Sequence, residues 1–80
     1  MNMQLDSDKS TITVDGGDVY TFSPRSPDAS AWTVTLNGTE VMHVDYFDGK
    51  TWPNGPLSHQ SVGREIADFW ASHLKKQGKL

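Results

Sequence analysis

The clearest periodic pattern of apolar residues lies between residues 61 and 76, in the segment SVGREIADFWASHLKK. At about 100° per residue, its large apolar side chains gather on one stripe and most of its charged side chains on the opposite side, which is typical of an amphipathic helix. We expect Ser58 or Ser61 to cap this helix and Gly78 to end it. The stripe must be covered, so the helix is expected to lie across a sheet. The stripe comprises Val62, Ile66, Phe69, Trp70, His73 and Leu74, and the opposite side comprises Arg64, Glu65, Asp68, Ser72 and Lys75.

The N-terminal third predicts a frayed end followed by a β-hairpin. Residues 1–8 have little apolar content and no periodicity, so we expect them to be frayed. The runs STITV and VYTF then flank DGGD, whose acids and glycines suit a turn with positive φ. In the register considered, Val14 pairs with Val19, and the pattern alone does not identify the inner face.

A second hairpin follows the segment SPRSPDAS, residues 23–30, which is expected to be a surface connection because of its prolines and serines. The runs AWTVTL and TEVMHVDYF alternate in polarity and are joined by Asn37-Gly38, a dipeptide that favours a type I′ turn. Pairing Leu36 with Thr39 places Trp32 opposite His43. In that register one face carries Trp32, Val34, Leu36, Val41, His43 and Phe47, and we expect this face to contact the helix.

The other face of this hairpin is more apolar than a solvent-exposed face requires. The pattern predicts no second helix to cover it, so we interpret it as an interface with a protein partner or a second copy of the chain. A fold-back of the N-terminal segment or of the loop containing Trp52 is the alternative cover. Tyr46 is the expected anchor, because it combines a large area with a polar tip. The predicted partner-binding residues are Met42, Val44, Tyr46, Thr33 and Thr35.

Residues 48–57, DGKTWPNGPL, are expected to form an ordered loop or a short extra strand, with Trp52 as a lid over one end of the core. Together these patterns predict one α+β domain over residues 1–80. Its architecture is a small antiparallel sheet of two hairpins, about four strands, packed by one C-terminal helix.

Composition narrows the classes of function. The chain has no cysteine, which favours a reducing compartment and hence a cytoplasmic location. It shows neither a secretion signal nor an apolar stretch long enough to cross a bilayer, so no membrane role is expected. Residues 1–48 hold eight acidic and two basic residues, whereas residues 49–80 hold two acidic and five basic residues. Strands that are acidic or neutral make a nucleic-acid partner unlikely.

The candidate chemistry is weak. His43 and Asp45 share a strand face and Asp48 is near in sequence, so an imidazole–carboxylate cluster is geometrically feasible. His59 and His73 do not complete a metal-ligand spacing, and neither a serine elbow nor a phosphate-binding glycine motif occurs. We therefore expect no enzyme activity, no metal and no cofactor.

In size and acidic composition the chain is similar to small proteins encoded by phages and mobile elements, including anti-CRISPR and anti-restriction inhibitors. This resemblance assigns no site residue. The leading interpretation is a non-catalytic protein-binding module or inhibitor that engages a macromolecular partner through its surface. A nucleic-acid-binding accessory domain is the alternative, and a small enzyme comes third.

Overall fold

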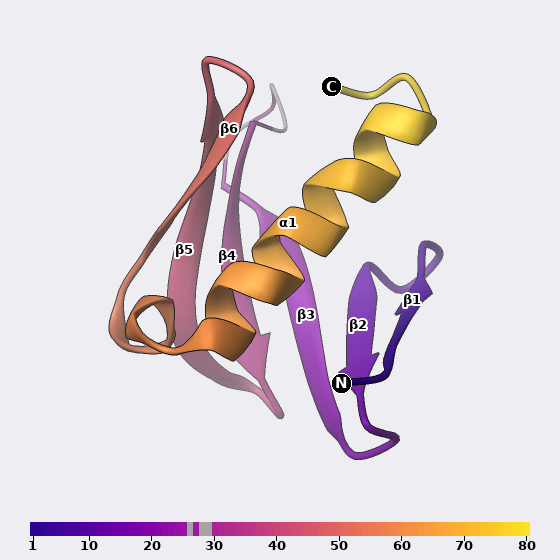
Figure 1. Ribbon diagram of the computed structural model, residues 1–80, viewed down its shortest axis with the longest axis vertical. Coiled ribbons are helices and arrows are strands. Elements are labelled where there is room, and N and C mark those ends of the chain that lie inside the picture. Colours follow the sequence, from indigo (N-terminus) through magenta and orange to yellow (C-terminus); the bar gives the residue numbers. More distant parts are fainter. Residues whose placement is uncertain (26, 28–29) are drawn as a thin grey trace.

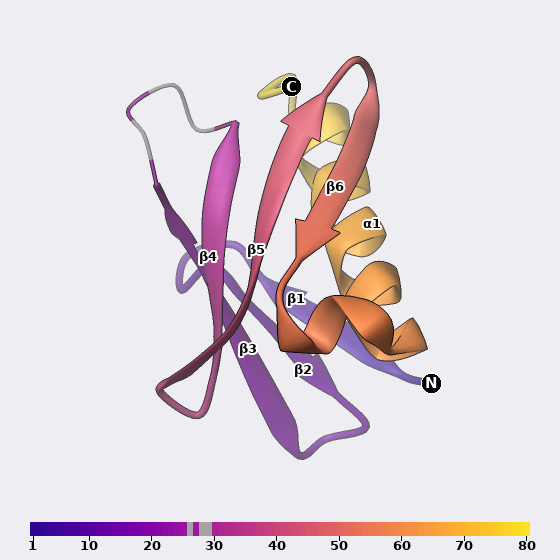
Figure 2. The same ribbon diagram turned by 90° about the vertical axis from the view of Figure 1, so that its left-hand side faces the viewer.

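A computed structural model describes residues 1–25, 27 and 30–80 of the chain. It contains an antiparallel six-stranded sheet whose strands follow one another in sequence order, with one α-helix packed across the sheet (Figure 1). The turned view shows α1 on one side of the sheet (Figure 2). The elements are β1 (Met3–Asp6), β2 (Thr11–Val14), β3 (Asp18–Pro24), β4 (Ala31–Leu36), β5 (Thr39–Phe47), β6 (Lys50–Asn54), the 3-10 helix η1 (Pro56–His59) and α1 (Ser61–Lys76).

The predicted α+β class, with an antiparallel sheet and a C-terminal helix, is confirmed, but the sheet has six strands instead of about four. One additional strand is β6, so the second of the two alternatives predicted for residues 48–57, a short extra strand, is the one observed. The other is β1, so the prediction of a frayed end over residues 1–8 is wrong. Met3 pairs with Val14 and Leu5 with Ile12, and both β1 residues pack against the core. Two alternating apolar residues were enough to add a strand because a neighbouring strand supplied the ladder.

The second hairpin departs from its predicted register at a β-bulge. The turn is as expected, because Leu36 pairs with Thr39, and Asn37 and Gly38 both have positive φ, 52° and 91°. Beyond the turn the register shifts between Thr35 and Val34, so Val34 faces Met42 and Trp32 faces Val44. One extra residue on β5 turns every later side chain of that strand to the opposite face.

The bulge exchanges the two faces of β5. Without it, His43 would face the helix, whereas with it Met42 and Val44 occupy the core at 1% and 0% exposure. Burying two apolar side chains in place of an imidazole favours the bulged register. The predicted assignment of His43 and Phe47 to the helix-covered face is therefore wrong.

The first hairpin also differs by one residue. Val14 pairs with Asp18, leaving a three-residue turn in which Asp15 and Gly16 have positive φ of 52° and 72°. Ile12 consequently pairs with Tyr20, and both are buried. Burial, with a smaller contribution from the charge of Asp18, raises the pKa of the Tyr20 hydroxyl above its usual range.

The core lies between this face of the sheet and α1, with Trp70 near its centre. The Trp70 ring stacks on Phe22 at 4.6 Å between centroids and meets Trp32 edge-on at 6.2 Å. The buried side of α1 is displaced from the predicted stripe toward its small residues. Val62 and Phe69 are only partly buried, at the margin of the core. The buried residues of α1 are Gly63, Ile66, Ala67, Trp70, Ala71 and Leu74.

The ends of α1 agree with the sequence prediction at one end only. Gln60 occupies the N-cap position without a side-chain hydrogen bond, and the Ser58 hydroxyl instead donates to the Gly55 carbonyl at 2.6 Å. At the other end Gly78 has φ of 72°, its N–H donates to Lys75 O at 3.0 Å, and Lys79 N–H donates to Leu74 O at 2.9 Å. This is the Schellman arrangement expected where glycine follows a helix.

The structure bears on two further expectations, the surface connection over residues 23–30 and the absence of a membrane-spanning segment. In the predicted connection over residues 23–30, Ser23 and Pro24 belong to β3, and residues 26, 28 and 29 lie outside the described part. Over the described residues, no helix has the length and apolar character needed to span a membrane.

Candidate functional site: the β5–β6 hairpin and the groove beside it

The five residues predicted to bind a partner do not form one surface. Met42 and Val44 are buried against the helix, and Tyr46 is half-buried on the same side of β5. Thr33 and Thr35 alternate with the buried Trp32 and Val34, so they lie on the opposite, helix-free face. The prediction that Met42, Val44 and Tyr46 are open to solvent is wrong, because the bulge turns them inward.

The helix-free face instead carries two exposed aromatic residues at one corner. Phe47 is 71% exposed and Trp52 is 52% exposed. Across the ladder Trp52 pairs with Asp45 and Phe47 pairs with Lys50. The pair between them, Tyr46 and Thr51, points toward α1, so the two aromatic side chains point away from it. We call Phe47 and Trp52 the aromatic corner. The predicted role of Trp52 as a lid over the core is wrong, since half of its surface remains in solvent.

The Trp52 ring has a fixed position despite its exposure. Its Nε1–H donates to the backbone carbonyl of Phe47 at 3.1 Å, across the turn that joins β5 to β6. That turn contains Asp48 and Gly49, which both have positive φ, 55° and 75°. A two-residue turn of this kind is rigid, so the indole is held by backbone on both strands of the hairpin. An aromatic ring held in place before binding loses little conformational freedom when it meets a partner.

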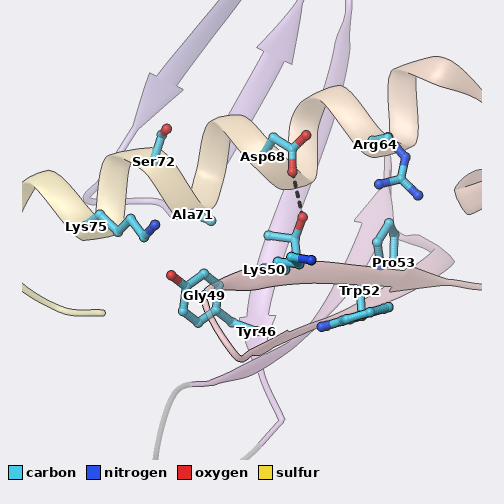
Figure 3. Close-up of a pocket in the computed structure, with 11 residues that line it drawn as sticks. Tyr46, Gly49, Lys50, Trp52, Pro53, Arg64, Asp68, Ala71, Ser72 and Lys75 are labelled. Carbon is cyan, nitrogen blue, oxygen red and sulfur yellow. Dashed lines mark hydrogen bonds between the residues drawn. The ribbon is translucent and has the colours of Figure 1, made fainter.

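A groove with a volume of about 470 Å³ runs between β6 and α1, and Trp52 of the aromatic corner is among the residues that line it. Figure 3 shows Arg64, Asp68 and Lys75 reaching from α1 toward β6. These three residues lie on the side of the helix that the sequence assigned to solvent. Opposite them, Lys50 and Thr51 line the groove from β6. The groove therefore exists because β6 passes beside the polar side of α1.

Charge in the groove is unbalanced in favour of cations. Lys50, Arg64 and Lys75 line it together with one acid, Asp68, whose Oδ1 accepts a hydrogen bond from the Thr51 hydroxyl at 2.6 Å. The Lys75 ammonium lies 5.7 Å from the centroid of the Tyr46 ring, a cation–π distance. This is a locally positive site on a protein whose net charge is −3.

The imidazole of His43 contacts a different carboxylate from the two that the sequence suggested. Its Nε2 contacts the carboxylate of Glu40, on the same strand at the bulge, and not that of Asp45 or Asp48. The described residues contain no group of three or more histidine and acidic side chains placed to hold a metal ion. One exposed histidine–glutamate pair supplies neither a metal centre nor a nucleophile.

A smaller pocket of about 150 Å³ lies at the C-terminal end of α1, near the turn that joins β1 to β2. Two of the side chains that line it have buried polar atoms, Trp70 Nε1 and His73 Nε2, and neither atom has a hydrogen-bond partner among the described residues. Unpaired buried polar atoms are uncommon in folded proteins and lower stability. The pocket is too small to compete with the groove as a site for a macromolecule.

Comparison of the chain with protein-family models, curated proteins and solved structures found no match. The assignment of a function therefore rests on the aromatic corner and the groove. The residues of both features are visible in the sequence, but their proximity depends on the bulge in β5 and on the position of β6, which the sequence pattern did not predict. The useful signal was Asp48-Gly49, which, like Asn37-Gly38, favours a two-residue hairpin turn and would have predicted β6 and its pairing.

Proposed function

We propose that the protein is a small non-catalytic protein-binding module that engages a partner protein through the aromatic corner. The observation that carries this proposal is the exposure of Phe47 and Trp52 on one rigid hairpin. Large aromatic side chains are enriched among the residues that dominate binding energy at protein interfaces. Neither ring is needed to fill the core, which Trp70, Trp32 and Phe22 already occupy. The module acts as an inhibitor if the surface it covers is the partner's functional surface.

A protein partner fits the surroundings of the corner better than a nucleic acid does. Exposed aromatic residues on a sheet can stack on bases, which is the case for the alternative. However, Asp45 lies directly across the ladder from Trp52, and Asp48 follows Phe47. A phosphate backbone crossing this corner would meet both carboxylates. The cysteine-free composition suits a reducing, cytoplasmic setting for such a module.

The proposal is tested by single substitutions at the corner. A partner is first isolated from the native cells with immobilised protein, purified, and titrated by calorimetry against the wild type, Phe47→Ala and Trp52→Ala. We expect each substitution to weaken binding by at least about tenfold, since interface anchors of this type contribute roughly 2 kcal/mol or more. Neither should alter the melting temperature by more than a few degrees, because both rings are largely exposed.

The matched control is Leu80→Ser, which removes exposed apolar area at a residue that belongs neither to the corner nor to the groove beside it. It should leave the affinity unchanged. Equal affinity of the wild type and both corner variants for the purified partner would contradict the proposal. Binding of single-stranded oligonucleotides that is lost in Trp52→Ala would favour the nucleic-acid alternative instead.

A further inference from the structure

We propose that the groove between β6 and α1 binds an acidic, extended segment of a partner protein. This deepens the proposed function, on which it rests for the existence of a protein partner, by giving the chemistry of one part of that partner. The groove and the aromatic corner share β6, so a single partner could contact both. The aromatic corner then supplies apolar anchoring, and the groove supplies selection by charge.

The three cations reach the groove from two elements and leave it open between them. Arg64 and Lys75 are eleven positions apart on α1, which corresponds to about 16 Å along the helix axis at 1.5 Å per residue. Lys50, which pairs with Phe47 at the beginning of β6, also lines the groove. Cations spread along such a length match carboxylates spaced along an extended chain better than one compact anion. An extended segment of about five residues covers the same distance at roughly 3.3 Å per residue.

These cations are available for a ligand. Between described residues, the single ion pair of the molecule joins His43 to Glu40, outside the groove. The carboxylate of Asp68 accepts from the Thr51 hydroxyl, and this bond ties the middle of α1 to β6. The groove is therefore held in shape by a neutral donor, and its cationic side chains are not consumed in doing so. All three are exposed, so their charges are hydrated and a single exposed pair would contribute little, but several pairs formed together add up.

The edge of β6 favours recognition of side chains over extension of the sheet. Pro53 is the fourth of the five residues of β6 and has no backbone N–H, which limits the hydrogen bonds that an added strand could make. A docked segment is thus recognised mainly through its carboxylates, by Arg64, Lys75 and Lys50. Affinity should consequently fall as salt rises.

A short acidic peptide suits the groove better than a nucleic acid. The groove is flanked by acids on the hairpin itself, with Asp48 in the turn and Asp45 paired with Trp52. The phosphates of a nucleic acid that continued past the groove along the hairpin would be repelled by these acids. The two ligands can be compared directly.

The test titrates the full chain, labelled with ¹⁵N, with hexaglutamate at low ionic strength, and follows amide chemical shifts. Hexaglutamine serves as the uncharged probe and a twelve-nucleotide oligothymidine as the nucleic-acid probe. We expect hexaglutamate to shift amides of β6 and of α1 between Arg64 and Lys75, and hexaglutamine to shift none. Charge reversal by Arg64→Glu with Lys75→Glu should weaken hexaglutamate binding by at least tenfold.

The matched control is Lys76→Glu with Lys79→Glu, which makes the same change in net charge at exposed residues that do not line the groove. This variant should retain affinity within about threefold, which allows for long-range electrostatics. The proposal is overturned by absence of localised shifts, by equal losses in the two variants, or by tighter binding of the oligothymidine. Circular dichroism establishes that both variants keep the helix and melt as the wild type does. The titration needs no partner, so its failure would leave the aromatic-corner proposal standing, and loss of that proposal would not alter the titration.

Discussion

At the scale of single residues, Trp70 connects the helix to the sheet more directly than any other side chain of α1. Its ring stacks on Phe22 of β3 and meets Trp32 of β4 edge-on, so one side chain bridges three elements. Phe69, next to it in the chain, lies at the margin of the core and is only partly buried. Helical periodicity placed both residues on the apolar side but could not rank them. The ranking depends on how far α1 is rotated, which the small residues Ala67 and Ala71 decide by letting the helix approach the sheet.

We expect Trp70→Ala to lower the free energy of unfolding by about 3–5 kcal/mol, because it removes the largest helix side chain from a packed aromatic cluster. Phe69→Ala should cost clearly less, about 1–2 kcal/mol, since its ring is partly exposed and leaves a smaller cavity. Urea denaturation followed by circular dichroism measures both. Trp70→Phe serves as an intermediate variant if Trp70→Ala does not fold. A larger loss for Phe69→Ala than for Trp70→Ala would mean that α1 is rotated so that Phe69, and not Trp70, lies at the centre of the core.

At the scale of elements, the sequence sufficed for the helix and the two hairpins but missed the strand β1, and the errors in register were single-residue shifts. The helix over residues 61–76 and the hairpin at Asn37-Gly38 follow from apolar periodicity and turn chemistry. The register beyond Thr35 does not, because a bulge is a compromise between ladder geometry and burial that involves both strands. Its effect reached the candidate site, since it exchanged Met42 and Val44 for His43 and Phe47 on the outer face. A half-buried strand with apolar residues on both faces leaves this choice open to a sequence reading.

The contact between η1 and α1 gives a test at this scale. Gly63, in the first turn of α1, is buried, and a Cβ added there would overlap the carbonyl oxygen of Leu57 in η1. On helix propensity alone, Gly63→Ala would stabilise α1 by up to about 1 kcal/mol. We expect the opposite, a lower melting temperature, because backbone must move to admit the methyl group.

The control for this prediction is Gly17→Ala. Gly17 lies in the turn between β2 and β3 without a positive φ, and an added Cβ would meet no atom within 4 Å. This substitution should be neutral or slightly stabilising, by about 0.4–1 kcal/mol at most. The measurement is the melting temperature of each variant compared with that of the wild type. A stabilised Gly63→Ala protein would show that η1 and α1 are not in close contact.

At the scale of the whole molecule, the sheet separates two surfaces of different character. One face is closed by α1 and contains the core. The helix-free face presents threonines at its centre, where Thr21 pairs with Thr11 on one side and Thr35 on the other. Acidic residues Asp6, Glu40 and Asp45 lie on the strands of that face. This distribution was visible in the sequence only as an acidic first part and a basic second part, since the pairing of strands was needed to locate the charges.

The same distribution predicts that the protein is a monomer, so that the aromatic corner is free to meet a foreign partner. Two copies joined by their helix-free faces would bring acidic side chains together, and this repulsion opposes dimerisation. Edge pairing is also disfavoured, because β1 has only four residues and β6 contains Pro53. Sedimentation equilibrium over a wide range of protein concentrations at low salt should therefore return the mass of one chain. If a dimer forms, the variant Trp52→Ala shows which surface makes it. Loss of the dimer in this variant would assign the corner to self-association and contradict the foreign-partner proposal. A dimer that persists would assign the contact to another surface and leave the corner available.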